Sequence, residues 1–588
     1  MKYFAFLIMM TSFLFAVGGV TLAGDATKPG EFKIDPPTLK CLGFRWYIDG
    51  DDNANASVDV TYRKESEPAW RDALPMLRVN REVVNQQFDP YTCGNLFAGS
   101  VMYLDPDTEY EVKFRLNDPD GGNAEKSVVV RTRPVPIAPD PDRTLHVYPA
   151  EYTGERQNPA YSSLLSVVDE LRPGDLVLLH AGVYSMNAAG IKIVKGGTSE
   201  KPIVFRGAET GESIVEGGGA KMIFDIRNAD HLFFENLTIR NGDHTFRADG
   251  ASWLTVRRCH IYDVRMGLYS YSENSTNWYI ADNTITGRNK DWYPRKQDNP
   301  SHTGINFYGR GHVVCYNRIS KFWDCLAIAN YGKPKESRDL QCVAIDMYNN
   351  DLFEAVDDGV ESDYGCHNVR IFDNRIFNCH TALSAQPFYG GPVYFIRNQV
   401  YGITALNLKL HNYCTGLEIY HNTLISAGQA FRSFKYWQNG TLRNNLFLGA
   451  TRYAVETGSP HPRTTLDYNG YRKTDDPEGR FIKWFDGKKE ERYNDLAEFE
   501  SNTGFEKHGV LVDFDTFINA EPPAEGVTYN ADFGDLRLRS SSAAIDSGLV
   551  LPSVNDNYSG RAPDLGCFEF GNRIPHYGPR NITKTESP

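Results

Sequence analysis

Residues 372–401 read FDNRIFNCHTALSAQPFYGGPVYFIRNQVY, in which an Asn followed by alternating apolar residues occurs twice, at Asn374 and Asn398. The same pattern recurs along the middle of the chain at Asn236, Asn283, Asn317, Asn350, Asn422 and Asn445, with Cys259 in the one gap. Successive positions are 23, 24, 34, 33, 24, 24, 24 and 23 residues apart. A fixed period of about 24 residues predicts a solenoid, in which each repeat stacks on the one before it.

The repeats are predicted to be β rather than helical. Their apolar residues alternate with a period of two, and no 3.6-residue period interrupts them. A repeat of this length fits one coil of a right-handed parallel β-helix, with three short strands and their turns. The Asn side chains would stack inside one turn, where they satisfy one another's buried amides. We therefore expect an all-β chain dominated by a parallel β-helix of about ten coils.

Residues 144–470 resemble the pectate-lyase-like β-helix superfamily, and the Asn repeat carries the resemblance. The stretch SSLLSVVDELRPGDLVLLHAGVY (162–184) is similar to the cap helix and first strand that close the apolar end of such stacks. Residues 471–588 have no clear period and resemble the trailing segment that packs along such helices. The resemblance implies a parallel β-helix, and the superfamily includes polysaccharide lyases, hydrolases, epimerases and tailspikes.

A separate small β-sandwich is expected over residues 37–134, where FRWYID, SVDVTYR, EYEVKFRL and SVVVRT alternate like strands. Between them, LDPDTEYEV (104–112) places a Pro turn before Tyr110, and a tyrosine hydroxyl pins a sandwich corner in this way. The stretch resembles the fibronectin type III family. That resemblance implies a spacer, a lid or a carbohydrate-binding module, because the fold by itself implies no activity. Residues 135–143 are a linker by composition.

The two ends and the composition limit the compartment and the partners. Residues 1–23 combine Lys2, an apolar run and small residues, as a signal peptide does, so we expect a secreted or periplasmic protein. No later stretch is apolar enough to span a bilayer. The net charge of −13 argues against a general nucleic-acid binder. We expect a monomer that acts on an anionic polysaccharide.

The chain has ten cysteines and no CxxC motif. Export permits disulfides, although a single sequence does not reveal their pairing. We expect one disulfide, between Cys41 and Cys93, because both belong to the predicted sandwich.

The strand after each Asn turn has a consistent register, so its outward residues can be read off. Coils that rise by about 4.8 Å would bring these residues into one array. The candidate substrate-binding residues on this face are Tyr269, Tyr271, Asn306, Tyr308, Gln386 and Asn407. The two long periods contain basic insertions, residues 287–302 and 331–341, which we expect to form opposite walls of a groove. The first carries Trp292, whose flat face suits a sugar ring.

Acidic and basic residues are expected to meet in this groove. In DDGVESD (357–363), Glu361 and Asp363 would share an exposed strand face, about 6.5–7 Å apart. Asp357 and Asp358 would lie in the turn just before. Two coils further, Lys409 and His411 would stand about 10 Å away along the axis, with Arg432 one coil beyond.

The first hypothesis is a lyase that cleaves a uronate polymer by β-elimination. Asp357, Asp358, Glu361 and Asp363 supply the oxygen ligands that suit Ca²⁺. Lys409 is the candidate base, with a pKa lowered by burial or by Arg432. Arg432 would stabilise the enolate-like charge, and His411 is an alternative base or acid. This set resembles the Ca²⁺/Lys/Arg chemistry of the alginate lyase and chondroitinase B family.

The same residues are compatible with two other functions. A glycoside hydrolase would use Glu361 and Asp363 as acid and base, since their expected spacing suits inversion. VDDGVE and RSFK resemble segments of polygalacturonases and favour that alternative. The third reading is a non-catalytic glycan-binding or adhesion protein.

Overall fold

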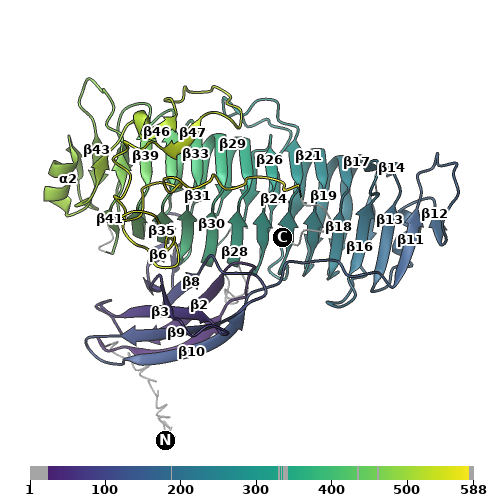
Figure 1. Ribbon diagram of the computed structural model, residues 1–588, viewed down its shortest axis with the longest axis horizontal. Helices are drawn as coiled ribbons and strands as arrows, with labels where there is room; N and C mark the ends of the chain where they lie inside the picture. Colours follow the sequence, from purple (N-terminus) through teal and green to yellow (C-terminus); the bar gives the residue numbers. More distant parts are fainter. Residues whose placement is uncertain are drawn as a thin grey trace, which may run out of the picture.

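The computed structural model describes residues 24–186, 189–328, 332, 334, 342–433, 436–459 and 463–581. It shows a long stack of parallel strands and a smaller antiparallel body beneath the middle of that stack (Figure 1). The expected signal peptide, residues 1–23, lies outside the described residues. Within the described ranges, no helix is long and apolar enough to cross a membrane.

The smaller body is a sandwich of two antiparallel four-stranded sheets. One sheet contains β1 (Lys28–Ile34), β2 (Leu42–Asp49), β8 (Asn95–Val101) and β5 (Leu77–Asn80). The other contains β10 (Ala124–Arg131), β9 (Glu109–Asn117), β3 (Ser57–Lys64) and β4 (Arg71–Ala73). Phe44, Trp46 and Phe114 are buried between them. The backbone N–H of Asp105 donates to the Tyr110 hydroxyl at 2.9 Å, so this tyrosine pins the corner as predicted.

The expected disulfide between Cys41 and Cys93 is wrong. All ten cysteines are buried, and Cys41 forms no disulfide. Cys41 belongs to a cluster on the β-helix side of the sandwich with Tyr348, whereas Cys93 packs in another cluster with Val343 and Tyr389. Each side chain fills apolar space at the contact between the two bodies, as buried cysteines commonly do.

Two parallel sheets build the stack. The first contains β12 (Ala160–Tyr161), β11 (Arg143–Val147), β13 (Asp175–Leu179), β16 (Ile203–Gly207), β18 (Leu232–Glu235), β20 (Thr255–Arg257), β22 (Tyr279–Ala281), β25 (Val313–Cys315), β28 (Val343–Tyr348), β30 (His367–Phe372), β32 (Val393–Ile396), β35 (Cys414–Tyr420), β38 (Trp437–Arg443) and β41 (Thr465–Asp467). The second contains β14 (Gly182–Ser185), β15 (Ile191–Ile193), β17 (Ser213–Arg227), β19 (Thr238–Asp249), β21 (His260–Tyr269), β23 (Thr284–Gly287), β24 (Thr303–Asn306), β26 (Arg318–Ser320), β27 (Asp324–Ala327), β29 (Asp351–Glu361), β31 (Arg375–Ala385), β33 (Gln399–Ile403), β34 (Leu406–Leu410), β36 (Thr423–Ser426), β39 (Leu446–Gly449), β42 (Gly470–Tyr471) and β45 (Val510–Leu511).

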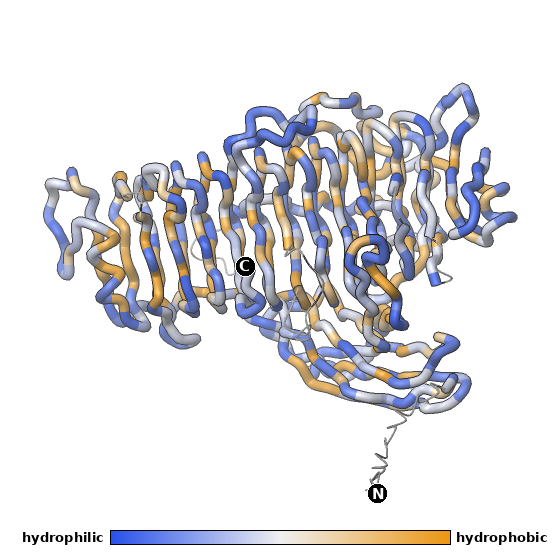
Figure 2. Tube along the Cα trace, turned by 180° about the vertical axis from the view of Figure 1, so that it is seen from behind, coloured by the Kyte–Doolittle hydropathy of each residue, from blue (hydrophilic) through white to orange (hydrophobic). Residues whose placement is uncertain are grey.

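Each coil has three faces, because the second sheet bends. In β31, residues 375–377 pair with β33, whereas residues 381–385 pair with β34. Asn378, with a φ of 53°, lies at the bend. Apolar residues follow the strands and hydrophilic residues gather in the turns and loops (Figure 2). The right-handed parallel β-helix is confirmed, and its fourteen-stranded sheet makes the stack longer than the ten coils expected.

A ladder of buried Asn side chains runs along the turn between the two sheets. The side-chain amide of Asn374 donates to the Asn398 side chain at 3.1 Å and to the carbonyls of Met347 and Phe372. Its oxygen accepts from the backbone and side chain of Asn350 at 3.0 Å. The same contacts join Asn283, Asn317, Asn350, Asn374, Asn398, Asn422, Asn445 and Asn469. The predicted stacking is therefore confirmed.

The ladder begins and ends at different residues from those expected. Asn236 has a φ of 55°, and its amide donates to the carbonyl of Ala208, outside the ladder. In this coil Leu237 occupies the position that Asn residues occupy in later coils. The prediction of Asn236 as a ladder residue was therefore one residue out of register. At the other end Asn469 continues the ladder, a residue that the period of 24 from Asn445 could have identified.

Glu506 terminates the ladder and gives a pH prediction. Its carboxylate accepts from Asn469 and Tyr471 at 2.8 Å, and burial raises its pKa to about 7. Because the unfolded pKa is about 4.3, the folded state binds more protons, and stability is lost as the pH rises through about 7. We expect Glu506→Gln to remove up to about 3 kcal/mol of this pH dependence.

The measurement is the free energy of unfolding of both proteins at pH 5 and pH 8. Glu500→Gln is the control, because Glu500 is only half-buried on α2 (Leu496–Thr503) and lies outside the Asn ladder. An unchanged slope in the Glu506→Gln protein would contradict the assignment.

The sandwich is fixed to the outer side of the first parallel sheet through buried polar contacts. Asn368 of β30 donates to Asp35 at 2.7 Å, and Ser100 donates to Asn368 at 3.0 Å. Thr38 donates to Asp346 of β28 at 2.6 Å. The sandwich therefore covers a different face from the outward residues of β29, β31 and β34.

The stack is closed at both ends. The expected cap helix is only one turn, α1 (Leu165–Val168), whose Val167 is buried in the core. Helix α2 covers the far end and packs Phe499 against Trp484. The chain then returns along the stack, where Arg580 pairs with Asp282 at 2.7 Å.

Candidate active site

A local departure from strand alternation brings the acids of β29 together. An added Cβ on Gly359 would meet the Ile376 side chain at 2.5 Å, so position 359 faces the interior. Val360 also faces inward and is fully buried. Asp358 and Glu361 flank these two inward residues, and both therefore point out of the coil. The sequence analysis placed Glu361 correctly, but it put Asp358 in a turn before the strand.

Three carboxylates converge at this point. Ligand oxygens of Asp324, Asp357 and Asp358 lie within 4.8 Å of one another. Asp324 belongs to β27, one coil below, and accepts the backbone N–H of Asp358 at 3.2 Å. The sequence analysis missed Asp324. The sequence signal for Asp324 was its position directly before the stretch CLAI, one coil before the DDGVESD segment.

The trio has the donor atoms with which a protein could hold a divalent cation. The Oδ1 atom of Asp358 is buried and has no hydrogen-bond partner. Burial, followed by the neighbouring carboxylates, raises the pKa of Asp324 well above its usual value. Burial raises the pKa of Asp358 to about 7 in spite of Lys409. A site of closely spaced, desolvated carboxylate oxygens suits a hard cation such as Ca²⁺.

Lys409 reaches this trio from two coils away. Glu361 pairs in register with Ser384, and Ser384 pairs with Lys409, so the three share one outward row. The Nζ atom of Lys409 lies 2.5 Å from Asp358. Burial lowers the pKa of Lys409, but the carboxylates of Asp358, Asp363, Asp357 and Glu361 raise it well above its usual value. The expectation of a lowered Lys409 pKa is therefore wrong.

Asp363 does not share an exposed face with Glu361. It is buried beyond the end of β29, where it accepts from Ser384 at 2.6 Å and from the backbone of Gln386 at 2.7 Å. It is also outside the converging trio, so its expected role as a ligand lacks geometric support. Gln386 in turn contacts His411 at 2.8 Å, which orients the imidazole at the end of β34.

Arg432 points away from the acids. Asn407 donates to the carbonyl of Ala430 at 2.7 Å, which places Arg432 one coil beyond Lys409, as expected. Its Nε atom nevertheless lies 3.3 Å from Glu456, on the far side. The partner expected to lower the pKa of Lys409 is thus engaged elsewhere.

Three of the expected substrate-binding residues are not in the groove. Tyr308 lies in the apolar core. Asn407 is fully buried, in the inward row that contains Gly359 and Ala382. Trp292 is buried under the C-terminal segment, where its Nε1 atom donates to Thr528 at 2.9 Å.

Tyr271 and Asn306 do line the face below the acids. Tyr271 is 45% exposed, and its ring lies 5.5 Å from that of the buried Tyr269. Asn306 is in register with Ala327 and therefore belongs to the row of Glu361. Its buried Oδ1 atom has no hydrogen-bond partner among the described residues.

One insertion wall is in place beside the acids. Within residues 287–302, Arg295 binds Asp357 through Nη2 at 2.6 Å. The second insertion, residues 331–341, lies almost wholly outside the described residues.

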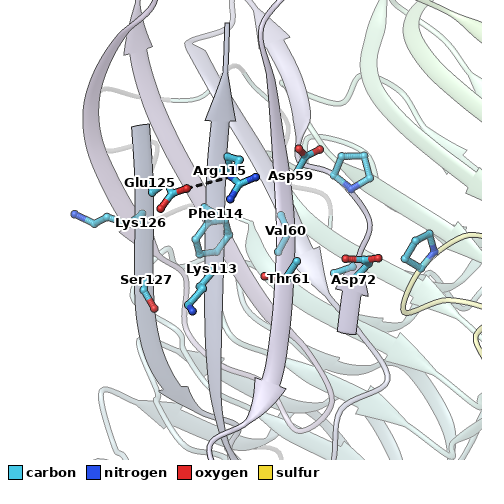
Figure 3. Close-up of a pocket in the computed structure, with 13 residues that line it drawn as sticks. Asp59, Val60, Thr61, Asp72, Lys113, Phe114, Arg115, Glu125, Lys126 and Ser127 are labelled. Atoms are coloured by element: carbon cyan, nitrogen blue, oxygen red, sulfur yellow. Dashed lines mark hydrogen bonds and ion pairs between the residues drawn. The ribbon is translucent and has the colours of Figure 1, made fainter. Parts of the chain in front are cut away.

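A concavity of about 770 Å³ lies elsewhere, on the outer sheet of the sandwich. Its labelled side chains spread along β10, β9 and β3 rather than converge (Figure 3). Arg115 pairs with Glu125 at 3.1 Å, and both are exposed. Balanced, solvated charges of this kind carry little binding energy, so the acid cluster is the better candidate for chemistry.

Comparisons with known proteins agree with this fold. The model of the chondroitinase B family matches residues 160–255, in the first coils of the stack. The solved structure of the pectate lyase Pel9A is similar at 15% identity, over 73% of this chain and 97% of that chain, with a TM-score of 0.38. The parallel β-helix itself is established by the strand order of this chain.

Two further solved structures are similar to this chain. An alginate lyase from Paenibacillus sp. str. FPU-7 shares 15% identity, over 44% of this chain and 92% of that chain, with a TM-score of 0.26. The catalytic domain of a GH87 alpha-1,3-glucanase shares 10% identity, over 78% and 85% of the two chains, with a TM-score of 0.29. No curated protein sequence matches significantly. At these identities the likeness concerns the fold and not the reaction.

Proposed function

We propose that this protein is a secreted polysaccharide lyase that cleaves a uronate-containing polymer by β-elimination. The observation that carries the proposal is Lys409, whose Nζ atom lies at the outward-facing acids, 2.5 Å from Asp358. Elimination requires a base for the proton alpha to the uronate carboxylate and positive charge to stabilise the enolate that forms. The chondroitinase B family match over residues 160–255 supports the same class of reaction.

Asp324, Asp357 and Asp358 would hold the Ca²⁺ ion. Such an ion neutralises the uronate carboxylate and offsets the negative charge that otherwise keeps Lys409 protonated. Compared with the predicted set, Asp324 is added, whereas Glu361 and Asp363 lie outside the converging trio. Asp363 instead positions Ser384 and the backbone of Gln386, and so indirectly His411.

In this mechanism Lys409 accepts the proton from the carbon next to the carboxylate. The amine stands in the same row as Glu361 and next to Asp358, so it is held by its neighbours and loses little side-chain freedom. His411, held by Gln386, is the candidate acid for the leaving oxygen. Asn306 and Tyr271 line the face on the other side of the acids and contact the sugar there.

The test is a screen of alginate, pectate, glycosaminoglycans and ulvan with the purified protein. A lyase gives an unsaturated product that absorbs in the ultraviolet, and EDTA should abolish the increase while Ca²⁺ restores it. Glycan binding without any new chain ends would instead identify an adhesion protein.

A hydrolase is the second candidate, favoured by the raised pKa of Glu361. Burial, followed by the charges of Asp324, Asp363 and Asp358, raises that pKa well above its usual value. A carboxylic acid that stays protonated is what a general acid in glycoside cleavage requires. New reducing ends without ultraviolet absorbance would establish hydrolysis and reject the lyase.

Asp324→Asn should weaken Ca²⁺ binding by roughly tenfold to a hundredfold, because it removes one charged oxygen ligand from the trio. Isothermal titration of the polysaccharide-free protein with Ca²⁺ measures this directly. Asp291→Asn is the matched control, since Asp291 is exposed on the inserted loop. Equal affinities of the Asp324→Asn variant and the wild type would remove Asp324 from the site.

A further inference from the structure

The inserted loop, residues 287–302, is held on two sides. At its base, Asn289 donates to the Ser301 carbonyl at 3.0 Å and accepts the Ser301 N–H at 2.8 Å. At its tip, Trp292 and Tyr293 bind Thr528 and Glu525 of the C-terminal segment, each at 2.9 Å. A loop braced in this way can hold a side chain in one place over the groove.

The side chain that it presents to the acids is Arg295. Its Nη2 atom lies 2.6 Å from one oxygen of Asp357, and its Nε atom lies 3.1 Å from the other. The guanidinium also stacks 4.7 Å from the ring centre of Trp323. The Arg295 side chain is nevertheless 37% exposed. It therefore forms a bidentate pair at the protein surface rather than a buried structural link.

Among the described residues, Arg295 is the one arginine in an ion pair with the acid trio. Arg432, the residue expected to meet the substrate anion, pairs with Glu456 instead. The planar fork of a guanidinium fits any carboxylate, whether from the protein or from a ligand. Asp357 is also a member of the proposed cation site, and a cation on that carboxylate weakens its hold on Arg295.

We propose that Arg295 recognises a carboxylate of the polymer, and that it exchanges Asp357 for the substrate carboxylate when the chain binds. This inference rests on the proposed function and assigns the determinant of its specificity for acidic sugars. Trp323 keeps the guanidinium plane oriented during the exchange, because the stacking contact does not depend on Asp357. No covalent step involves Arg295.

The experiment uses the uronate polymer that the wild-type protein cleaves, as oligomers in the free-acid form and as methyl esters. Binding is measured by calorimetry in the Lys409→Met background, which prevents turnover. We expect Arg295→Ala to weaken binding of the free acid by roughly tenfold to a hundredfold and to leave the ester within about twofold. The affinity of the Arg295→Lys variant for the free acid should lie between those of the parent and of Arg295→Ala, because lysine keeps the positive charge and lacks the planar fork of the guanidinium.

Lys296→Ala is the matched control, since Lys296 is the next residue and is exposed. It should bind both forms as the parent does. Equal losses for acid and ester would assign Arg295 a role in loop structure and overturn the inference, as would unchanged binding of the acid. If the wild-type protein yields no unsaturated product from any polymer, the proposed function itself fails. That outcome is separate from a failure at Arg295.

Discussion

Lys409→Met is expected to lower the rate of elimination by roughly 10²–10⁴-fold, the usual contribution of a positioned general base. Methionine keeps the length and apolar stem of the side chain and removes only the amine. The loss should appear in kcat, because Lys409 acts on the proton in transfer rather than on the polymer as a whole. Ultraviolet detection of the unsaturated product measures the rate.

The control for Lys409→Met is Lys201→Met. Lys201 also forms a Lys–Asp pair, 2.7 Å from Asp142, but in the first coils and exposed to solvent. It should retain full activity. The melting temperature of each variant is needed as well, since removing the amine leaves acids uncompensated, at a cost of about 3–5 kcal/mol in buried pairs. A folded Lys409→Met protein with the wild-type rate would exclude Lys409 as the base.

Asn374→Ala should destabilise the fold by about 3 kcal/mol or more. The substitution removes three donated and two accepted contacts from the middle of the ladder. It leaves the backbone N–H of Asn350 without an acceptor and the side-chain amide of Asn350 with the Val314 carbonyl alone, and a buried unsatisfied group costs about 1–3 kcal/mol. The free energy of unfolding in urea measures the loss.

Asn236→Gly is the matched control for the ladder. Asn236 stands outside the ladder, and glycine adopts its positive φ without strain. We expect a change of less than about 1 kcal/mol at this position. Equal losses at positions 236 and 374 would show that the ladder contributes nothing special to stability.

The Asn repeat predicted the fold well because both parts of the signal are local. The alternation sets which side chains enter the core, and the Asn spacing sets where each coil turns. The reading was wrong at Asn236, where Asn fits the left-handed backbone of the turn and not the ladder. It also stopped short of Asn469, although the period reached that residue.

The candidate site was predicted less completely, and the errors have one physical origin. Strict alternation misplaces residues wherever a strand turns two neighbours inward, as it does at Gly359 and Val360. That departure turns Asp358 outward and buries Asn407, which lies two strands along the sheet. Tyr308 and Trp292 were misplaced for a related reason, because loops and the C-terminal segment cover them.

The sequence by itself determined the coil, its period and the row that carries Glu361 and Lys409, since these follow from backbone pairing between consecutive repeats. Only the tertiary structure decided that Asp324 joins Asp357 and Asp358, that Lys409 meets Asp358, and that Arg295 rather than Arg432 reaches the acids. Such contacts join side chains tens of residues apart in the chain. Their partners depend on local bulges and on the course of an inserted loop, and a repeat pattern specifies neither.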